Sequence, residues 1–228
     1  MSLIKQPFGF GAGGGLATQG GVDFDGSSGY ATFTAGTGVE TGSGPFTMAG
    51  WIISDDISSS SIVEIGNVCM DFQAEAKLQL HINGAGNHRS DSANIVIDTL
   101  THCVITHATA AMGAANTKIY VNGSVVAATM GGTGTPALTS DGNIGSMGGG
   151  GYFMNGVIAQ VGVWSSVLSA AEIAVLYNSG KLYDYRDENG AYTSSADLVH
   201  YFMMNEGTGA NLEDLGTAGN DATLQGTY

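Results

Sequence analysis

The segment from Phe153 to Gly180, FMNGVIAQVGVWSSVLSAAEIAVLYNSG, constrains the fold more than any other part of the chain. From Val157 to Trp164 the pattern has the two-residue period of a strand in a sheet. One face takes Val157, Ala159, Val161 and Val163, and the other takes Ile158, Gln160, Gly162 and Trp164. Ser169 and Glu172 then form a capping box, and Gly180 is expected to end the helix. The pattern predicts a strand that leads into one short helix near 169–179.

Glycine content indicates what surrounds this segment. Of 228 residues 37 are glycine, well above the average of about 7%. This composition is typical of many short strands joined by turns that need positive φ. Asn122-Gly123, between KIYV and SVVAA, predicts a two-residue hairpin turn. The chain therefore reads as an antiparallel sandwich of two sheets.

A series of motifs in chain order supports one β domain from residue 21 to 228. They are Phe24-Asp25-Gly26 with Tyr30, FTMAGWI from Phe46, HCVIT from His102, KIYVNG from Lys118, and YFMMNEG from Tyr201 with Asp214 and Gly219. Together with the strand and helix above, they resemble the concanavalin A-like lectin/glucanase superfamily, and within it the laminin-G and pentraxin type of jelly roll. The resemblance implies an all-β, two-sheet antiparallel jelly-roll sandwich. It implies fold more than function, since this fold carries lectins, adhesion modules, glycosidases and spacers.

Residues 1–20 differ in character from the rest. Their large apolar side chains are Leu3, Ile4, Phe8 and Phe10, and a glycine-rich run follows. We interpret the segment as an assembly anchor with a flexible linker that contacts neighbouring subunits; a disordered terminus is the alternative. Pro7 and the glycines interrupt the apolar helix of a signal peptide, so none is recognised. Display on a phage or virus particle, or another extracellular location, would reconcile this with the fold.

Charge excludes some partners. Six basic and 20 acidic residues give a net charge of −14, which disfavours nucleic acid and anionic membranes. The sequence contains no run of 18 apolar residues, so insertion into a membrane is not predicted. Cys69 and Cys103 lie on different predicted strands, where they either pair or remain reduced in the core.

No catalytic constellation is evident. There is no G-x-S-x-G or phosphate-binding loop in context. His102 and His107 are expected to face opposite ways on one strand, and His81 and His88 to flank a turn, so zinc is not indicated. Asp71 and Glu75 share a predicted strand face, but their Cα atoms would be roughly 13 Å apart, too far for a retaining glycosidase pair. We expect no enzyme and assign no catalytic residue.

The resemblance allows a structural calcium ion, because hard oxygen ligands suit calcium. Candidate loops hold Asp55-Asp56, Asp141-Gly142-Asn143, and Asp184 with Asp187, Glu188 and Asn189. A solvated turn explains each loop equally well. No metal ligand is assigned.

Aromatic residues suggest where a ligand would bind. The resemblance places Trp51 and Trp164 in the core. Exposed aromatic rings are expected in loops, and the candidate ligand-binding residues are Tyr152, Tyr183, Tyr185 and Tyr192. The sequence thus favours a non-enzymatic, homo-oligomeric recognition or decoration module displayed on a virion, with glycan binding. The alternatives are a structural virion subunit that contacts only neighbouring proteins, and a glycoside hydrolase.

Overall fold

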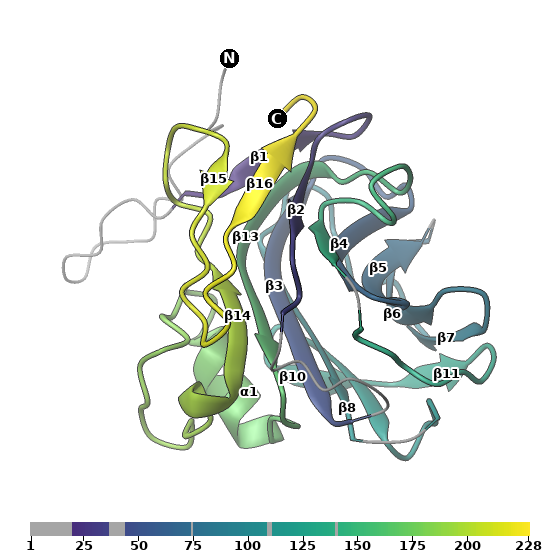
Figure 1. Cartoon of the computed structure of the whole chain (residues 1–228). Coiled ribbons are helices and arrows are strands. Elements are labelled where there is room, and N and C mark those ends of the chain that lie inside the picture. Colours follow the sequence, from purple (N-terminus) through teal and green to yellow (C-terminus); the bar gives the residue numbers. More distant parts are fainter. Residues whose placement is uncertain (1–19, 37–43, 74, 109–110, 140) are drawn as a thin grey trace.

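The chain folds into two antiparallel β-sheets that pack face to face (Figure 1), in a computed structural model that describes residues 20–36, 44–73, 75–108, 111–139 and 141–228. Within these residues one sheet has seven strands. Its order is β1 (Val22–Asp25), β13 (Asn155–Trp164), β3 (Phe46–Ser54), β8 (Thr101–His107), β9 (Thr117–Val121) and β10 (Ser124–Val126), with β14 (Leu198–Phe202) also paired to β13.

The second sheet has nine strands in the same described residues. Its order is β11 (Ala128–Met130), β7 (Gly86–Ser90), β6 (Lys77–Ile82), β5 (Val68–Gln73), β4 (Ser60–Ile65), β12 (Gly142–Ile144), β2 (Tyr30–Phe33), β16 (Ala222–Gln225) and β15 (Asn211–Leu212). The predicted all-β sandwich is confirmed.

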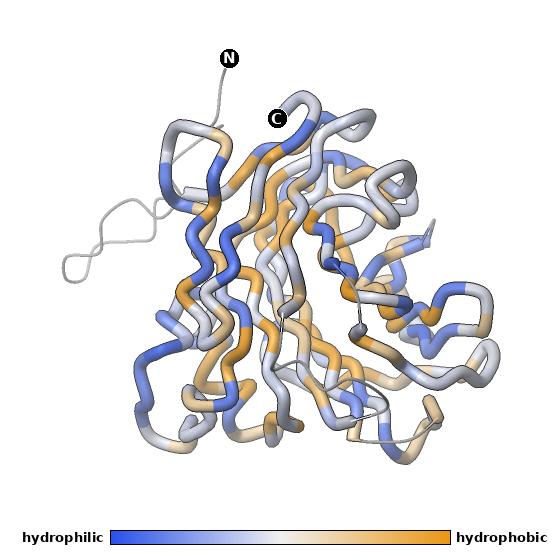
Figure 2. Tube along the Cα trace, in the orientation of Figure 1, coloured by the Kyte–Doolittle hydropathy of each residue, from blue (hydrophilic) through white to orange (hydrophobic). Residues whose placement is uncertain are grey.

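The main core lies between the sheets. Alternate strand residues supply it, among them Met48, Ile105, Met70, Leu80 and Phe202, all buried. In Figure 2 the hydrophobic stretches follow the strands, whereas the outer loops are mostly hydrophilic. Burial of these side chains, about 25 cal/mol per Å² of apolar surface, is the main force that holds the sheets together.

The predicted alternation along β13 is wrong beyond Ala159. Gln160 has φ 46°, and the pairing with β3 shifts between Ala159 and Gly162. This bulge adds one residue and reverses the faces that follow. As a result the side chains of Ile158 and Val161 both lie in the main core. The sequence pattern had placed these two residues on opposite faces of the strand.

The predicted helix is confirmed as α1 (Ala170–Tyr177). The Glu172 amide donates to Ser169 Oγ at 3.2 Å, and the Ser169 amide donates to Glu172 Oε2 at 2.8 Å. The left-handed C-cap is Asn178, with φ 45°, so the cap lies two residues before the predicted Gly180. Among the residues that the structure describes, no helix is long and apolar enough to cross a membrane.

Helix α1 and the segment after it cover the outer face of the seven-stranded sheet. Beneath them lie Trp164 and Trp51, 0% and 1% exposed, which confirms the expectation that both tryptophans are buried. They belong to small clusters of their own rather than to the core between the sheets. The segment includes a short 3-10 turn, η1 (Ser195–Asp197).

Two local predictions concern turns and chain ends. Asn122 and Gly123, with φ 51° and 76°, form the expected turn between β9 and β10. Strands β1 and β14 both pair with β13, at Asn155–Ile158 and at Val161–Trp164 respectively. Residues 1–19, which carry the predicted anchor, lie outside the described residues.

Candidate functional site

The outer face of the nine-stranded sheet carries two rows of mostly polar side chains, which we call the polar face. Residues directly opposite each other on paired strands project to the same side. One row runs across seven strands through Thr223, Thr32, Asn143, Glu64, Cys69, His81 and Asn87. The second runs across five through Ser61, Asp71, Gln79, Arg89 and Thr129. Their chain neighbours, such as Met70 and Leu80, face the core.

The middle of the polar face is buried. Asp71 is 0% exposed, Gln79 1% and Cys69 2%, whereas Arg89 and Asn87 are partly exposed. Asp71 Oδ2 and Gln79 Oε1 are buried and make no hydrogen bond of good geometry in the described part of the chain, although the Asp71 carboxyl interacts with the side chains of His81, Gln79 and Gln73. An unsatisfied buried polar group costs about 1–3 kcal/mol. Two such acceptors on neighbouring strands leave the middle of the face incompletely hydrogen-bonded, and a ligand reaches them only where the side chains around them move.

Asp71 and His81 are coupled electrostatically. Oδ2 of Asp71 lies 3.4 Å from Nδ1 of His81, within ion-pair range, but the geometry leaves both atoms without a hydrogen bond. Burial raises the pKa of the Asp71 carboxyl, and proximity to His81 opposes that rise. The Asp71 carboxylate in turn raises the pKa of His81.

A glycine-rich loop flanks the face at β4. The amide of Gly148 donates to Glu64 Oε2 at 2.6 Å, and Asn143 Nδ2 donates to the same oxygen at 2.9 Å. Gly148 has φ 62°, which glycine adopts without strain. The loop returns at Tyr152, whose carbonyl accepts from the Ser61 amide at 2.8 Å. Tyr152 is thus held beside β4 with its side chain 43% exposed.

The opposite end of the face is hollowed. A depression of about 210 Å³ lies over β6, β7 and β11. The side chains that line it include Lys77, Asn87, Arg89, Asp91 and Thr129. Gln79 pairs with Arg89 across β6 and β7, so the depression continues the row that contains Asp71.

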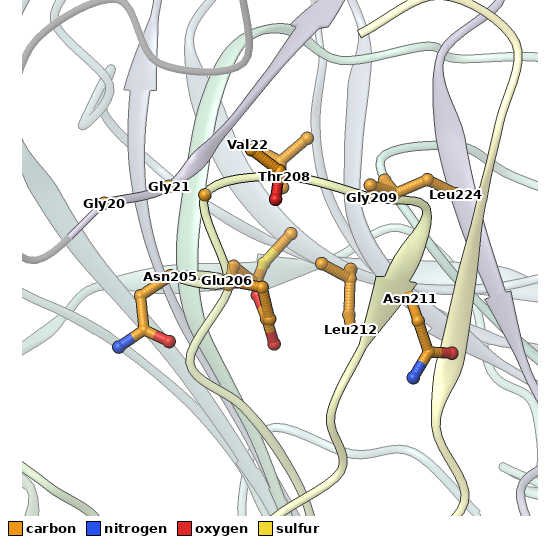
Figure 3. A pocket seen from close by; sticks show the side chains of 12 residues that line it. Gly20, Gly21, Val22, Asn205, Glu206, Thr208, Gly209, Asn211, Leu212 and Leu224 are labelled. Carbon is orange, nitrogen blue, oxygen red and sulfur yellow. The ribbon is translucent and has the colours of Figure 1, made fainter.

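A smaller hollow lies at the other end of the sandwich (Figure 3). It is lined mainly by glycines and apolar side chains, including Val22, Leu212 and Leu224, with Asn205, Glu206 and Asn211 at its border. Its volume is about 20 Å³, roughly the space of one water molecule. It is too small for a sugar.

The cysteine of the polar face, Cys69, is not an activated nucleophile. Burial, together with the carboxylates of Asp71 and Glu64, raises the pKa of Cys69 well above its ordinary value. Its thiol therefore stays protonated, and the thiolate is the nucleophilic form. Cys69 and Cys103 are both free, on opposite sheets.

The carboxylate pair considered from sequence does not share a strand face. Asp71 is fully buried, whereas Glu75 is exposed. Glu75 lies beyond the end of β5 with φ 108°, and Oε2 accepts from Lys77 Nζ at 2.8 Å. The turn after Gln73 breaks the alternation that placed them together.

Four tyrosines were predicted to be exposed. The prediction is wrong for Tyr185 and Tyr192, because both side chains are 0% exposed. Trp164 Nε1 donates to Tyr192 Oη at 3.0 Å, and Tyr192 Oη donates to the Tyr185 carbonyl at 2.6 Å. They fill a cluster over the seven-stranded sheet, so neither offers a free ring to a ligand. Tyr183 is partly buried at the edge of this cluster and donates to the Asp187 carbonyl. Tyr152 has the more open ring and remains a candidate contact.

The acidic loops serve local roles. Asp56 accepts from Ser58 and Asn155, Asp184 pairs with Arg186 at 2.6 Å, and Glu188 accepts from Ser195. Within the described ranges, no three His, Cys, Asp or Glu side chains come together in a metal-binding group. In two of the three candidate calcium loops, carboxylates are therefore already bound by protein donors.

The chain belongs to the concanavalin A-like lectin/glucanases superfamily, whose family model matches residues 25–174. Among curated proteins no match to the sequence was found.

Solved structures show the same fold. A candidate carbohydrate-binding protein from Bacteroides ovatus is 19% identical with a TM-score of 0.64; the match covers 90% of this chain and 58% of that one. A heptameric SAP-like pentraxin from Limulus polyphemus is 14% identical, with a TM-score of 0.52 over 77% of this chain and 88% of that one. The CBM40 module of a Ruminococcus gnavus IT-sialidase, bound to α2,3-sialyllactose, is 13% identical, with a TM-score of 0.51 over 69% and 96%.

Proposed function

We propose that this protein is a non-enzymatic carbohydrate-binding module and that the polar face is its binding site. The proposal rests on the two rows of polar side chains on the outer face, with Asp71 Oδ2 and Gln79 Oε1 incompletely hydrogen-bonded in the middle and a depression of about 210 Å³ at one end. Sugar hydroxyls are donors of the required kind, so a glycan that displaces the side chains around these buried atoms would satisfy both. The superfamily match and the carbohydrate-binding proteins among the structural neighbours support the same class of ligand.

The face has the features that glycan recognition uses. Carboxylates and amides in the rows accept and donate in fixed directions because the sheet holds them. Tyr152, exposed beside β4, supplies an apolar ring on which a sugar can stack. We assign Asp71 and Gln79 to hydroxyl binding, and Tyr152 to stacking at the rim.

Glycoside hydrolysis is the alternative function, because the polar face carries the carboxyl groups of Asp71 and Glu64. Asp71 has a raised pKa, as a general acid would. The nearest carboxylate in the other row, Glu64, has Oε2 occupied by Asn143 and Gly148. A carboxyl group whose oxygen is held by two donors suits positioning better than attack. We therefore propose binding without turnover.

The proposal extends to surface display. Leu3, Ile4, Phe8 and Phe10, followed by a glycine-rich run, suit an anchor on a tether. We propose that residues 1–20 attach the domain to neighbouring subunits, as in a homo-oligomeric decoration protein on a phage or virus particle. A structural subunit that contacts only other proteins would use the same anchor but would bind no glycan.

A glycan array with the full chain tests the binding proposal. We expect a restricted set of glycans to bind, and binding to be lost in Asp71→Asn. Asp98→Asn is the matched control, because Asp98 is exposed in a loop away from the polar face. Absence of any bound glycan, or equal loss in both variants, would refute the assignment. Release of reducing sugar from a bound glycan would establish the hydrolase instead.

A further inference from the structure

The distribution of positive charge adds a feature to the polar face. The chain has a net charge of −14, and its basic residues in the described part are Lys77, Arg89, Lys118, Lys181 and Arg186. Lys77 and Arg89 line the same 210 Å³ depression. They are diagonal neighbours, because Arg89 pairs with Gln79, two residues beyond Lys77. Diagonal neighbours on a sheet lie about 7–8 Å apart.

The two cations differ in how they are neutralised. Lys77 Nζ is 2.8 Å from Glu75 Oε2. In the described residues Arg89 forms no ion pair and no side-chain hydrogen bond, and its charge interacts with Glu75 from a distance. The other arginine, Arg186, is bound by both oxygens of Asp184, at 3.0 and 2.6 Å. Among the residues that the structure describes, the planar guanidinium of Arg89 is therefore left without an acceptor.

The same depression contains one acidic side chain. Asp91 Oδ1 accepts from Thr129 Oγ1 at 2.7 Å, so one of its oxygens is already bound. An acidic ligand group would be repelled by Asp91 and attracted by Arg89. It is therefore expected at the guanidinium, on the side of Gln79.

We infer that the depression is a subsite for the acidic group of a glycan, a carboxylate or a sulfate ester, bound by the Arg89 fork. A guanidinium binds such groups through two parallel hydrogen bonds. The volume of about 210 Å³ is below the roughly 300–1,000 Å³ of pockets that enclose a whole drug-sized ligand. It suits one substituted sugar, with the following units across Gln79 and Asp71. This inference rests on the proposed function and names its ligand class.

The net negative charge of the chain disfavours non-specific binding of acidic glycans. A protein with net charge −14 repels polyanions in general. Binding of an acidic glycan must therefore come from a specific local site. Because one or two cations carry it, binding should weaken with added salt only modestly.

The test is a glycan array of carboxylated and sulfated oligosaccharides printed beside their uncharged parents, with poly-glutamate as a non-sugar anion. Wild type should bind acidic glycans at least tenfold better than their parents. Arg89→Gln should abolish that preference, and Arg89→Lys should weaken it, because the charge remains but the fork is lost. Lys118→Gln, an equal charge change at an exposed position on β9 of the other sheet, should leave it intact. Melting temperatures establish that each variant is folded.

The outcomes separate this inference from the proposed function. Binding of uncharged glycans alone, or acidic binding that survives Arg89→Gln, overturns the acidic subsite and leaves the polar face as a sugar site. Poly-glutamate binding as strong as glycan binding overturns it as well. No glycan bound at all overturns both.

Discussion

Asp71 and His81 are diagonal neighbours on β5 and β6, with Oδ2 3.4 Å from Nδ1, on the outer face of the nine-stranded sheet. The carboxylate is buried, and the imidazole is partly exposed. This pairing places a titrating group beside the unsatisfied acceptors on which the proposed sugar site depends.

Asp71→Asn should lower the pKa of His81, because the contact with the Asp71 carboxylate is the main cause of its rise. A folded pKa raised above the unfolded value stabilises the protein at low pH, and that stability is lost as pH rises through the folded pKa. The wild type should therefore lose part of its stability above the His81 pKa, and the variant should lose less. NMR titration of the ring and melting curves from pH 5 to 9 measure both effects. An unchanged His81 pKa would contradict the coupling.

His102 should make the fold sensitive to acid. It is fully buried and stacks on Trp51, with ring centroids 4.6 Å apart. Burial lowers its pKa to about 3. The unfolded chain takes up a proton below pH about 6.5, so stability falls as pH drops from there toward 3, by up to about 1.4 kcal/mol per pH unit. His102→Phe keeps a ring in the stack and should flatten that slope in denaturant titrations. An unchanged slope would show that other groups cause it.

Truncating either buried tryptophan should destabilise the domain. Trp51→Ala and Trp164→Ala should each cost about 3–5 kcal/mol, as large-to-small changes in a core do. The Trp164→Ala change would also remove the indole N–H that donates to Tyr192 Oη. Urea unfolding measures the loss, and a value below about 1 kcal/mol would mean that the cluster over the seven-stranded sheet contributes little to stability.

Removing residues 1–20 should separate assembly from folding. Strands β1 and β14 complete the edge at β13 without them. A 21–228 chain is expected to melt near the full-length temperature but to lose self-association, measured by sedimentation. Unfolding on truncation, or assembly that persists, would refute the anchor hypothesis.

Strands, turns and the helix could be predicted because local chemistry determines them. The capping box of Ser169 and Glu172 and the Asn122-Gly123 turn need only neighbouring residues. The bulge at Gln160 could not be predicted, since it depends on pairing with β3. Tyr185 and Tyr192 were misplaced because acidic residues between them suggest an exposed loop, whereas their rings pack on Trp164 and Tyr201.

The polar face was missed for a related reason. The alternation of Lys77, Gln79 and His81 with Leu78, Leu80 and Ile82 is visible in the sequence and indicates a strand with one polar side. What no single strand reveals is the register that aligns Asp71, Gln79 and Arg89 in one row. The site is a property of strand pairing across the sheet.

The most direct test of the central claim is the binding affinity of Gln79→Met for a glycan identified on the array, measured with its melting temperature. Gln79 Oε1 is buried without a donor, but the Gln79 side chain also hydrogen-bonds the Asp71 carboxyl, so replacing the amide with an apolar chain of similar shape should cost about 1–3 kcal/mol of stability and leave the domain folded. If that atom is reserved for a sugar hydroxyl, the variant should bind at least tenfold more weakly. Undiminished binding by a folded Gln79→Met variant would contradict the claim that the polar face is the carbohydrate site.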